Sequence, residues 1–391
     1  MRKEDPLRVL IAGGGTAGHI YPALAVGQAL LAGPADPVPT TAPAPGRAAP
    51  PPAAGLLFLH GPRRIDAEVV AHSGFPHHGL DVGPIRGTAP HRLAANVLRL
   101  GRATAQAYRA LRDFRPHVVL ATGGYVSAPS ILAARLAGVP VVLYLPDASP
   151  GLAVRVLAPL ADRIALSFPI TKRYFRGTKA IVTGYPVRPE FLRADKAAAR
   201  QAFALTADLP VVMVMGGSTG AHSLNRAVGD ALEPLLRHAH LIHLCGDHDE
   251  PWLRQRRAAL GPDLRTRYHL FRYLHRGIAG AMAASDLVVC RAGASAMAEL
   301  PILRLPAILV PGTFAGGHQQ RNADFLVAQG GAIKLADRDL AQGAMLATVV
   351  SLLQDRPRRE RMAAEMGRLA RPEAAANIAS LVRSIARRRR S

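Results

Sequence analysis

The sequence predicts an α/β protein made of two doubly wound domains, and three observations lead to this fold class. Short, fully apolar segments alternate with longer segments of helical periodicity, which is typical of parallel strands buried between two layers of helices. A strand–glycine–helix unit occurs near the start of the chain, and a new one begins near residue 210. A chain of 391 residues is also longer than a single hydrophobic core usually supports.

The apolar segments define the expected strands in order. In the first half we expect strands at 8–13, 56–61, 117–124, 140–146, 163–168 and 180–186. In the second half we expect them at 210–218, 241–246, 268–274, 287–293 and 306–312. We therefore predict a first domain over 1–187, a second over 188–370, and a C-terminal helix with a basic tail over 371–391. Ligands of such sheets bind beyond the carboxyl ends of the strands, here in an expected cleft between the domains.

Two segments fall outside this alternation. Residues 33–55 form a Pro/Ala-rich insert between the first helix and the second strand, and its composition suits a solvated, extended loop. The tail at 380–391 ends a helical pattern in an arginine run, residues 387–390. The simplest interpretation is a solvated helix end, and the alternative is contact with anionic lipid.

The net charge of +22 raises the question of a nucleic-acid partner. The 49 basic residues comprise 44 arginines and only 5 lysines, and no aromatic stacking platform, helix-turn-helix pattern or zinc-finger spacing accompanies them. We therefore expect no nucleic acid, but an anionic membrane surface or a phosphate-rich ligand.

The location of the protein can also be predicted. No apolar run approaches the roughly 18 residues that a membrane span needs. The N-terminus carries acidic residues and leads straight into a strand-like segment, so we expect no signal peptide. Cys245 and Cys290 lack metal or redox spacing, which indicates packed thiols of a cytoplasmic protein.

Three strand-to-helix turns share one glycine-rich design, at 12–19, 121–130 and 215–225. Glycine lets a ligand approach backbone N–H groups closely, and the following helix offers its positive end to a phosphate. No P-loop motif is present. Gly13, Gly15 and Gly18 approximate a dinucleotide fingerprint, but no acid ends the second strand, so an NAD-dependent oxidoreductase is poorly supported.

A further cluster spans residues 285–326, where a glycine turn, a helix and a polar loop follow a strand. The Glu299 carboxylate near the start of that helix could accept both hydroxyls of a ribose, while helix N–H groups face a diphosphate; alternatively it is an ordinary first-turn glutamate. Uncharged donors and acceptors suited to sugar hydroxyls follow, at His318, Gln319, Gln320 and Asn322.

Taken together, "GGGTAGHIYPALAVGQAL", "ATGGYVSAPSILAA", "MGGSTGAHSLN", "VVCRAGASAMAE" and "HQQRNADFL" resemble the MurG family of glycosyltransferase family 28. This family transfers N-acetylglucosamine to a lipid-linked muramyl-pentapeptide in peptidoglycan synthesis. The resemblance implies a GT-B fold, UDP-N-acetylglucosamine as donor, and an undecaprenyl-diphosphate-linked muramyl-pentapeptide as acceptor. It also implies an inverting reaction with no cofactor and no essential metal, and peripheral attachment to the cytoplasmic face of the membrane.

The resemblance assigns roles to single residues. It implies that His19 is the catalytic histidine and that Arg188 lies near the uracil, Ser218 near the diphosphate and Leu274 with its backbone against the uracil. The remaining substrate-binding positions that it implies are Thr16, Ala17, Gly18, Asp147, Ala294, Ser295, Ala296, Met297, Ala298, Glu299 and Gln319.

The chain departs from the family pattern at three places. Ala17 replaces a glycine of the usual G-G-T-G-G-H, "YLPD" at 144–147 replaces the usual "HEQN", and Tyr185 opens "YPVR" in place of "NPVR". Asp147 therefore stands where the family has an asparagine, either as a second candidate base or as a turn residue.

Several alternatives stay open at this point. His19 is a general base, a ligand of the acceptor diphosphate, or a helix-start histidine bonded to nearby backbone. Basic residues that could anchor the protein to a membrane, or simply line a solvated helix face, are Arg86, Arg92, Arg99 and Arg102. Rival functions are a UDP-sugar transferase with another lipid acceptor, a UDP-N-acetylglucosamine epimerase, and a non-catalytic relative that binds membrane or nucleic acid.

Overall fold

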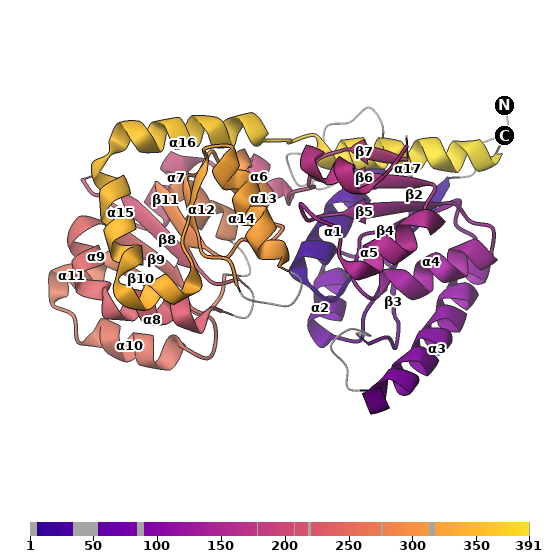
Figure 1. Ribbon diagram of the computed structural model, residues 1–391, viewed down its shortest axis with the longest axis horizontal. Helices are drawn as coiled ribbons and strands as arrows, with labels where there is room; N and C mark the ends of the chain where they lie inside the picture. Colours follow the sequence, from indigo (N-terminus) through magenta and orange to yellow (C-terminus); the bar gives the residue numbers. More distant parts are fainter. Residues whose placement is uncertain are drawn as a thin grey trace, which may run out of the picture. The chain divides into compact units, whose positions relative to one another are not determined.

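The computed structural model describes residues 6–33, 54–83, 90–177, 179–206, 208–217, 220–274, 277–312 and 317–390. The chain divides into two compact units (Figure 1). The first comprises Met1–Pro189 together with Pro372–Ser391, and the second comprises Glu190–Arg371. The sequence analysis set the final helix apart, whereas its residues here belong to the first unit.

Among the described residues, the first unit holds a seven-stranded parallel sheet in the order β3-β2-β1-β4-β5-β6-β7. The strands are β1 Leu7–Ala12, β2 Ala54–His60, β3 His77–Gly79, β4 Val118–Ala121, β5 Val141–Leu145, β6 Arg163–Leu166 and β7 Ala180–Val182. Its helices are α1 Ala17–Ala32, α2 Arg64–His72, α3 Pro90–Phe114, α4 Ser127–Leu136, α5 Leu152–Leu157 and α17 Ala374–Arg390, with 3₁₀ turns η1 Ala158–Leu160 and η2 Pro169–Tyr174. The core lies where the strand side chains meet the helices, as at the fully buried Leu10, Val119 and Leu143.

In the second unit, the described residues form a six-stranded parallel sheet in the order β10-β9-β8-β11-β12-β13. The strands are β8 Val211–Met215, β9 His240–Leu244, β10 Tyr268–Phe271, β11 Leu287–Cys290, β12 Ala307–Leu309 and β13 Ala332–Lys334. Helices α6 Pro189–Leu192, α7 Lys196–Ala202, α8 His222–Asp230, α9 Leu232–His238, α10 Glu250–Ala258, α11 Pro262–Arg267 and α12 Ile278–Ala284 precede or separate the first four strands. The later ones are α13 Ala296–Ile302, α14 His318–Ala328, η3 Asp337–Gln342, α15 Ala344–Gln354 and α16 Arg356–Leu369.

The predicted fold class is confirmed, and each predicted strand overlaps an observed one. Two strands were missed, β3 and β13. Both have three residues at the edge of a sheet, and their sequences "HHG" and "AIK" contain too few apolar residues to stand out from a loop.

Each sheet contains one point at which the chain reverses its direction of travel across the sheet. In the first unit β1 leads outward to β2 and β3, and the chain then returns to β4 on the other side of β1. In the second unit β8 and β11 have the same relationship. The loops that follow these paired strands leave the sheet side by side, and this is where open α/β sheets bind ligands.

The C-terminal helix α17 completes the first unit. It packs against α1, with Ile378, Ala379 and Val382 fully buried. The Arg383 guanidinium donates to the carbonyl oxygens of Ala29 and Leu30 at 3.1 Å each. These carbonyls lie in the last turn of α1, where no helical N–H is available to them, so Arg383 caps that helix. This supports a structural role for the helix that carries the arginine tail.

The Pro/Ala-rich insert lies almost wholly outside the described residues. Its last two residues, Ala54 and Gly55, begin strand β2.

Candidate active site

The first glycine loop turns directly from β1 into α1. Gly15 has a φ of +87°, a conformation that suits glycine, and Thr16 is extended before the helix begins at Ala17. Charged groups from the start of α2 hold this loop. The Gly15 N–H donates to Asp66 Oδ2 at 2.7 Å, and Arg63 donates to the Gly15 carbonyl at 2.7 Å. Asp66 is 1% exposed. The Gly15 amide, which the sequence predicted to be available to a phosphate, is therefore already bound to a buried carboxylate.

His19 lies in the first turn of α1 and is partly exposed. Its Nδ1 lies 2.8 Å from the Thr16 hydroxyl, and its backbone carbonyl accepts from the Thr122 hydroxyl at 2.9 Å. With Nδ1 engaged in this way, Nε2 is the nitrogen that could exchange a proton with a bound molecule. A side chain of the first loop therefore helps to orient the ring.

The second glycine loop packs against the first. A Cβ atom at Gly13 would lie 2.3 Å from the Thr122 Oγ1, and one at Gly124 would lie 2.7 Å from the Gly14 carbonyl oxygen. Gly123 and Gly124 both have positive φ, at +93° and +75°. The glycines of these loops are therefore needed for close contact between the two loops, which is a reason that the phosphate hypothesis did not include.

The residues of "YLPD" and "YPVR" that depart from the family pattern lie close together. The rings of Tyr144 and Tyr185 meet edge to face with centroids 6.3 Å apart. Tyr144 is buried, its hydroxyl lies 2.6 Å from Ser167 Oγ, and burial raises its pKa well above the usual value. Tyr185 donates to the Gly18 carbonyl at 3.4 Å. The two tyrosines thus connect the end of β5 with the loop that carries His19.

Asp147 follows β5 and is partly exposed. Its backbone carbonyl accepts a long hydrogen bond, 3.4 Å, from the Thr171 hydroxyl. Arg188 lies in the same unit, with its guanidinium 4.6 Å from the centroid of the Tyr21 ring. This is a cation–π arrangement on α1, three residues from the Gly18 position.

In the second unit, the third glycine loop follows β8. Gly217 and Gly220 have positive φ, and a Cβ at Gly220 would lie 2.7 Å from the carbonyl oxygen of Cys245. Ser218 lies outside the described residues.

Both cysteines are buried free thiols, as predicted, and burial raises the pKa of Cys245 to about 11 and that of Cys290 to about 12.

An arginine that sequence reasoning missed connects the loops of this unit. Arg291 follows β11 and donates to the Ser223 hydroxyl at 2.9 Å, to the Val310 carbonyl at 3.1 Å, and to Asp337. Its side chain is only 12% exposed, so the ion pair with Asp337 is largely shielded. A charged residue directly after the wholly apolar "LVVC" was the available signal.

Helix α13 begins one residue after Ser295, and Glu299 lies in its first turn, as predicted. Ala296, Met297 and Glu299 are buried, whereas Ala294, Ser295 and Ala298 are partly exposed. Glu299 as a whole is 7% exposed. A Cβ at Gly293 would meet nothing within 4 Å, so the start of this turn faces open space.

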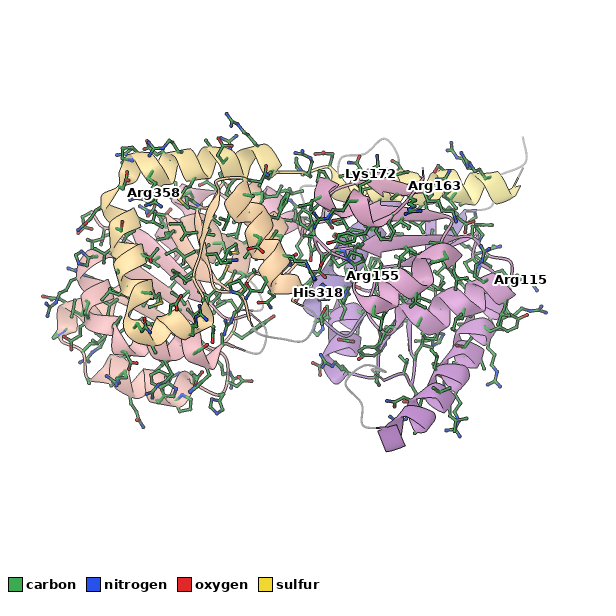
Figure 2. The ribbon with its side chains drawn as sticks, viewed as in Figure 1. Arg115, Arg155, Arg163, Lys172, His318 and Arg358 are labelled. Carbon is green, nitrogen blue, oxygen red and sulfur yellow. The ribbon has the colours of Figure 1, made fainter. Side chains whose placement is uncertain are left out.

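Helix α14 brings its polar side chains to the same edge of the sheet, with His318 at its first position (Figure 2). Gln319 Oε1 accepts from the Gly312 N–H at 2.8 Å, and Asn322 donates to the Ala292 carbonyl at 3.0 Å. Gln319 and Asn322 thus fix the loops after β12 and β11, and only part of their hydrogen-bonding capacity is left for a ligand. Leu274 lies three residues beyond β10 and is partly exposed.

The two sheets and their glycine loops define a class of protein, the two-domain GT-B glycosyltransferases and their structural relatives. The fold resembles a crystal structure of MurG from Acinetobacter baumannii, with a TM-score of 0.73 and 23% identity over 97% of this chain and 100% of that one. It also resembles UDP-GlcNAc 2-epimerase from Neisseria meningitidis, with a TM-score of 0.65 and 14% identity over 97% and 100% of the two chains. The fold is therefore shared by both of the enzyme classes that the sequence analysis weighed.

Sequence relatives decide between these classes. Residues 53–166 match the glycosyltransferase family 28 N-terminal domain, and residues 211–379 match its C-terminal domain. The UDP-N-acetylglucosamine–N-acetylmuramyl-(pentapeptide) pyrophosphoryl-undecaprenol N-acetylglucosamine transferase of Roseiflexus sp. (strain RS-1) is 40% identical over 99% of this chain and 97% of that protein. The transferase of the same name from Desulforudis audaxviator is 37% identical over 97% of this chain and 99% of that protein. The chain belongs to glycosyltransferase family 28, in the group formed by these transferases.

No helix in the described part of the chain combines the length and the apolar character required to cross a bilayer.

Proposed function

We propose that this protein is an inverting transferase that moves N-acetylglucosamine from UDP-N-acetylglucosamine to the lipid-linked muramyl-pentapeptide of peptidoglycan synthesis. The observation that carries the proposal is the identity of 37–40% with transferases of that name over almost the whole chain. The retained His19, Glu299 and Gln319 favour an active enzyme over a non-catalytic relative.

The second unit is the proposed donor-binding part. Loops after β8, β11 and β12 leave three adjacent strands, and the register pairs Met215 with Cys290 and Cys290 with Leu309, so the loops start at one level. We assign the diphosphate to the third glycine loop and the turn at Ala294–Ser295, the ribose to Glu299, and the sugar to Gln319. Backbone amides there would stabilise the charge that develops on the departing UDP.

The first unit is the proposed source of the base. His19 Nε2 takes the proton from the acceptor hydroxyl, whose oxygen then forms the new bond to C1 of the sugar. The bond between C1 and the UDP oxygen breaks on the opposite face, so the configuration at C1 inverts and UDP leaves. The Thr16 hydroxyl, 2.8 Å from Nδ1, orients the ring for this transfer. Asp147, which follows β5, is the alternative base.

A peripheral position on the cytoplasmic face of the membrane completes the proposal, because the acceptor is a lipid. Helix α3 presents Val97 and Leu98 exposed, and Arg99 and Arg102 are exposed beside them. An apolar pair flanked by cations suits an anionic bilayer surface, where each cation contributes about 1 kcal/mol. Arg86 and the side chain of Arg92 lie outside the described part of the chain.

The test is turnover of UDP-N-acetylglucosamine with a soluble analogue of the lipid-diphosphate muramyl-pentapeptide, run beside calorimetric binding of UDP. UDP release that depends on this acceptor is the expected result. UDP binding without turnover would contradict the proposed acceptor and favour a transferase for another lipid, to which the "YLPD" departure would then point. No UDP binding would contradict the donor assignment itself.

A further inference from the structure

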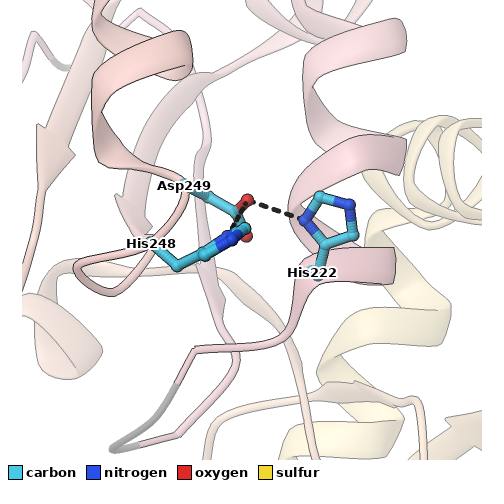
Figure 3. A group of neighbouring side chains, drawn as sticks. All are labelled: His222, His248 and Asp249. Carbon is cyan, nitrogen blue, oxygen red and sulfur yellow. Dashed lines mark hydrogen bonds and ion pairs between the residues drawn. The ribbon is translucent and has the colours of Figure 1, made fainter.

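Two histidines and an aspartate form a compact cluster in the second unit, next to the third glycine loop. His222 is the first residue of α8, and His248 and Asp249 lie in the loop between β9 and α10. Nδ1 of His222 lies 2.7 Å, and Nδ1 of His248 3.1 Å, from the same Oδ1 of Asp249 (Figure 3). We propose that His222, His248 and Asp249 bind a divalent transition-metal ion of the zinc type.

The donor set and its spacing support this class of ion. Imidazole nitrogen and carboxylate oxygen are the ligands that zinc and its neighbours in the periodic table prefer. Ligand atoms that each lie about 2.1 Å from a tetrahedral zinc ion are about 3.4 Å apart. One possible ligand atom from each of the three residues already lies within 4.8 Å of the others, so small rotations of two side chains would close the site.

The exposure of the cluster fits an open site. Side chains of His222 and His248 are 61% and 85% exposed, whereas that of Asp249 is 3% exposed. Both imidazoles can therefore turn toward an ion at little cost, and water can fill the remaining coordination positions. Three protein ligands and a solvent-facing position are what an exchangeable site requires, in contrast to a closed structural site.

Buried groups behind the cluster fix the carboxylate. Asp249 Oδ2 accepts from the Asn225 amide at 2.7 Å, and Oδ1 also accepts from the Trp252 indole N–H at 2.9 Å. The carboxylate is therefore already held in a fixed orientation by its hydrogen-bond donors, in the way that outer partners hold a metal ligand.

Asn225 is itself oriented by a second, deeper pair. Its Oδ1 lies 3.0 Å from Nε2 of His243, whose Nδ1 lies 2.9 Å from the Tyr268 hydroxyl. All of these groups are buried, so the orientation of Asp249 is determined by the core of the second unit. Partners of this kind behind a ligand typically change metal affinity 10- to 100-fold when they are removed.

Two histidine–aspartate hydrogen bonds without an ion are the competing explanation of the same contacts. The explanations differ in their response to metal. A bound ion occupies the imidazole nitrogens that face Asp249, so binding saturates at one ion per site. Hydrogen bonds alone give no saturable response to metal. The proposal does not depend on the transferase activity.

Cobalt(II) titration of the untagged protein is the primary test, because its visible absorption reports the ligands directly. We expect one saturable equivalent whose absorption Zn²⁺ abolishes by competition. His222→Ala and His248→Ala should each weaken binding about tenfold or more. Both side chains are exposed, so these variants should fold. His238→Ala, which removes another exposed histidine of the same unit, should leave the titration unchanged.

A thermal-unfolding series with Zn²⁺ gives an independent readout. An ion that binds only the folded state raises the midpoint more strongly the further its concentration exceeds the Kd, so at one Zn²⁺ concentration wild type and His238→Ala should shift alike and His248→Ala should shift less. The proposal is overturned if wild type shows no saturable Co²⁺ absorption, or if His222→Ala and His248→Ala bind Co²⁺ as wild type does.

Discussion

The imidazole of His19 rests directly on Gly123 of the second glycine loop. A Cβ atom at Gly123 would lie 2.9 Å from Cδ2 and 3.0 Å from Nε2 of that ring. Gly123 also has a φ of +93°, a backbone conformation that residues other than glycine rarely adopt. The position of the proposed base is therefore determined by a residue that lies 104 positions away in the sequence.

Gly123→Ala should displace the His19 ring and lower kcat by about 100-fold, the loss that a 1 Å misplacement of a reacting group can cause. UDP affinity should stay unchanged, because the proposed donor groups lie in the other unit. Gly138→Ala is the matched control, since φ is +65° there and a Cβ would meet nothing within 4 Å. Equal losses of kcat in both variants would show that backbone strain alone is responsible.

His19→Ala should lower kcat by a factor of 10² to 10⁴, the usual contribution of a general base. Thr16→Val keeps the shape of the side chain but removes the group that faces Nδ1, so a smaller loss of about tenfold is expected, with UDP affinity retained. Steady-state kinetics with the soluble acceptor analogue measure both. If His19→Ala turns over within a few-fold of wild type, the base must be another group, with Asp147→Asn as the next variant to measure.

Tyr185 has a partner because Pro22 lies inside α1. Proline has no N–H, so the Gly18 carbonyl four residues earlier lacks its usual helical donor, and the Tyr185 hydroxyl reaches it at 3.4 Å. Tyr185→Phe should cost about 1 kcal/mol of unfolding free energy or less, as expected for one weak hydrogen bond. In a Pro22→Ala background the restored N–H replaces the hydroxyl, so the same change should cost less. A double-mutant cycle in denaturant measures the difference, and strict additivity would exclude the coupling.

Acid should destabilise the second unit through His243. Burial lowers the pKa of His243 to about 3, so the folded state keeps this imidazole neutral. In the unfolded chain the same imidazole binds a proton near pH 6.5. The free energy of unfolding that is present above pH 6.5 is therefore lost as pH falls from 6.5 toward 3. One group can account for up to about 1.4 kcal/mol per pH unit. Fluorescence of the single tryptophan, Trp252, follows unfolding of this unit. His243→Gln should be less stable at pH 7 but show a shallower slope, and an unchanged slope would assign the acid sensitivity elsewhere.

The sequence was sufficient for the fold where elements are long and apolar. Strands such as β5, "VVLYL", are fully buried, so their composition alone identified them. The same reasoning placed Glu299 in the first turn of α13 and placed Gln319 and Asn322 on one helix. It failed at β3 and β13, because a three-residue edge strand needs little apolar surface.

Contacts between distant segments could not be predicted from local patterns. Asp66 binds the Gly15 amide across 51 positions, and Arg291 pairs with Asp337 across 46. The glycines at 13 and 124 suggested phosphate binding, yet both are also required where the first two loops touch. A glycine pattern shows that a position has no room for a side chain. Only the fold shows which neighbouring group lies where that side chain would be.

Glu299 offers the sharpest test of the proposed donor site. A carboxylate can accept hydrogen bonds from both ribose hydroxyls, whereas an amide offers a single acceptor oxygen. Glu299→Gln should therefore weaken UDP binding by about 10- to 100-fold, in line with the roughly 1.5–3 kcal/mol of a hydrogen bond to a charged group. A ligand without the ribose hydroxyls distinguishes this role from a general disturbance of the buried site. Wild type should bind 2′,3′-dideoxyuridine diphosphate more weakly than UDP. Glu299→Gln should bind the two ligands with nearly the same affinity. Glu233→Gln, an exposed glutamate on α9, is the matched control and should behave as wild type. If Glu299→Gln lowers affinity for both ligands by the same factor, the carboxylate stabilises α13 without touching the ribose.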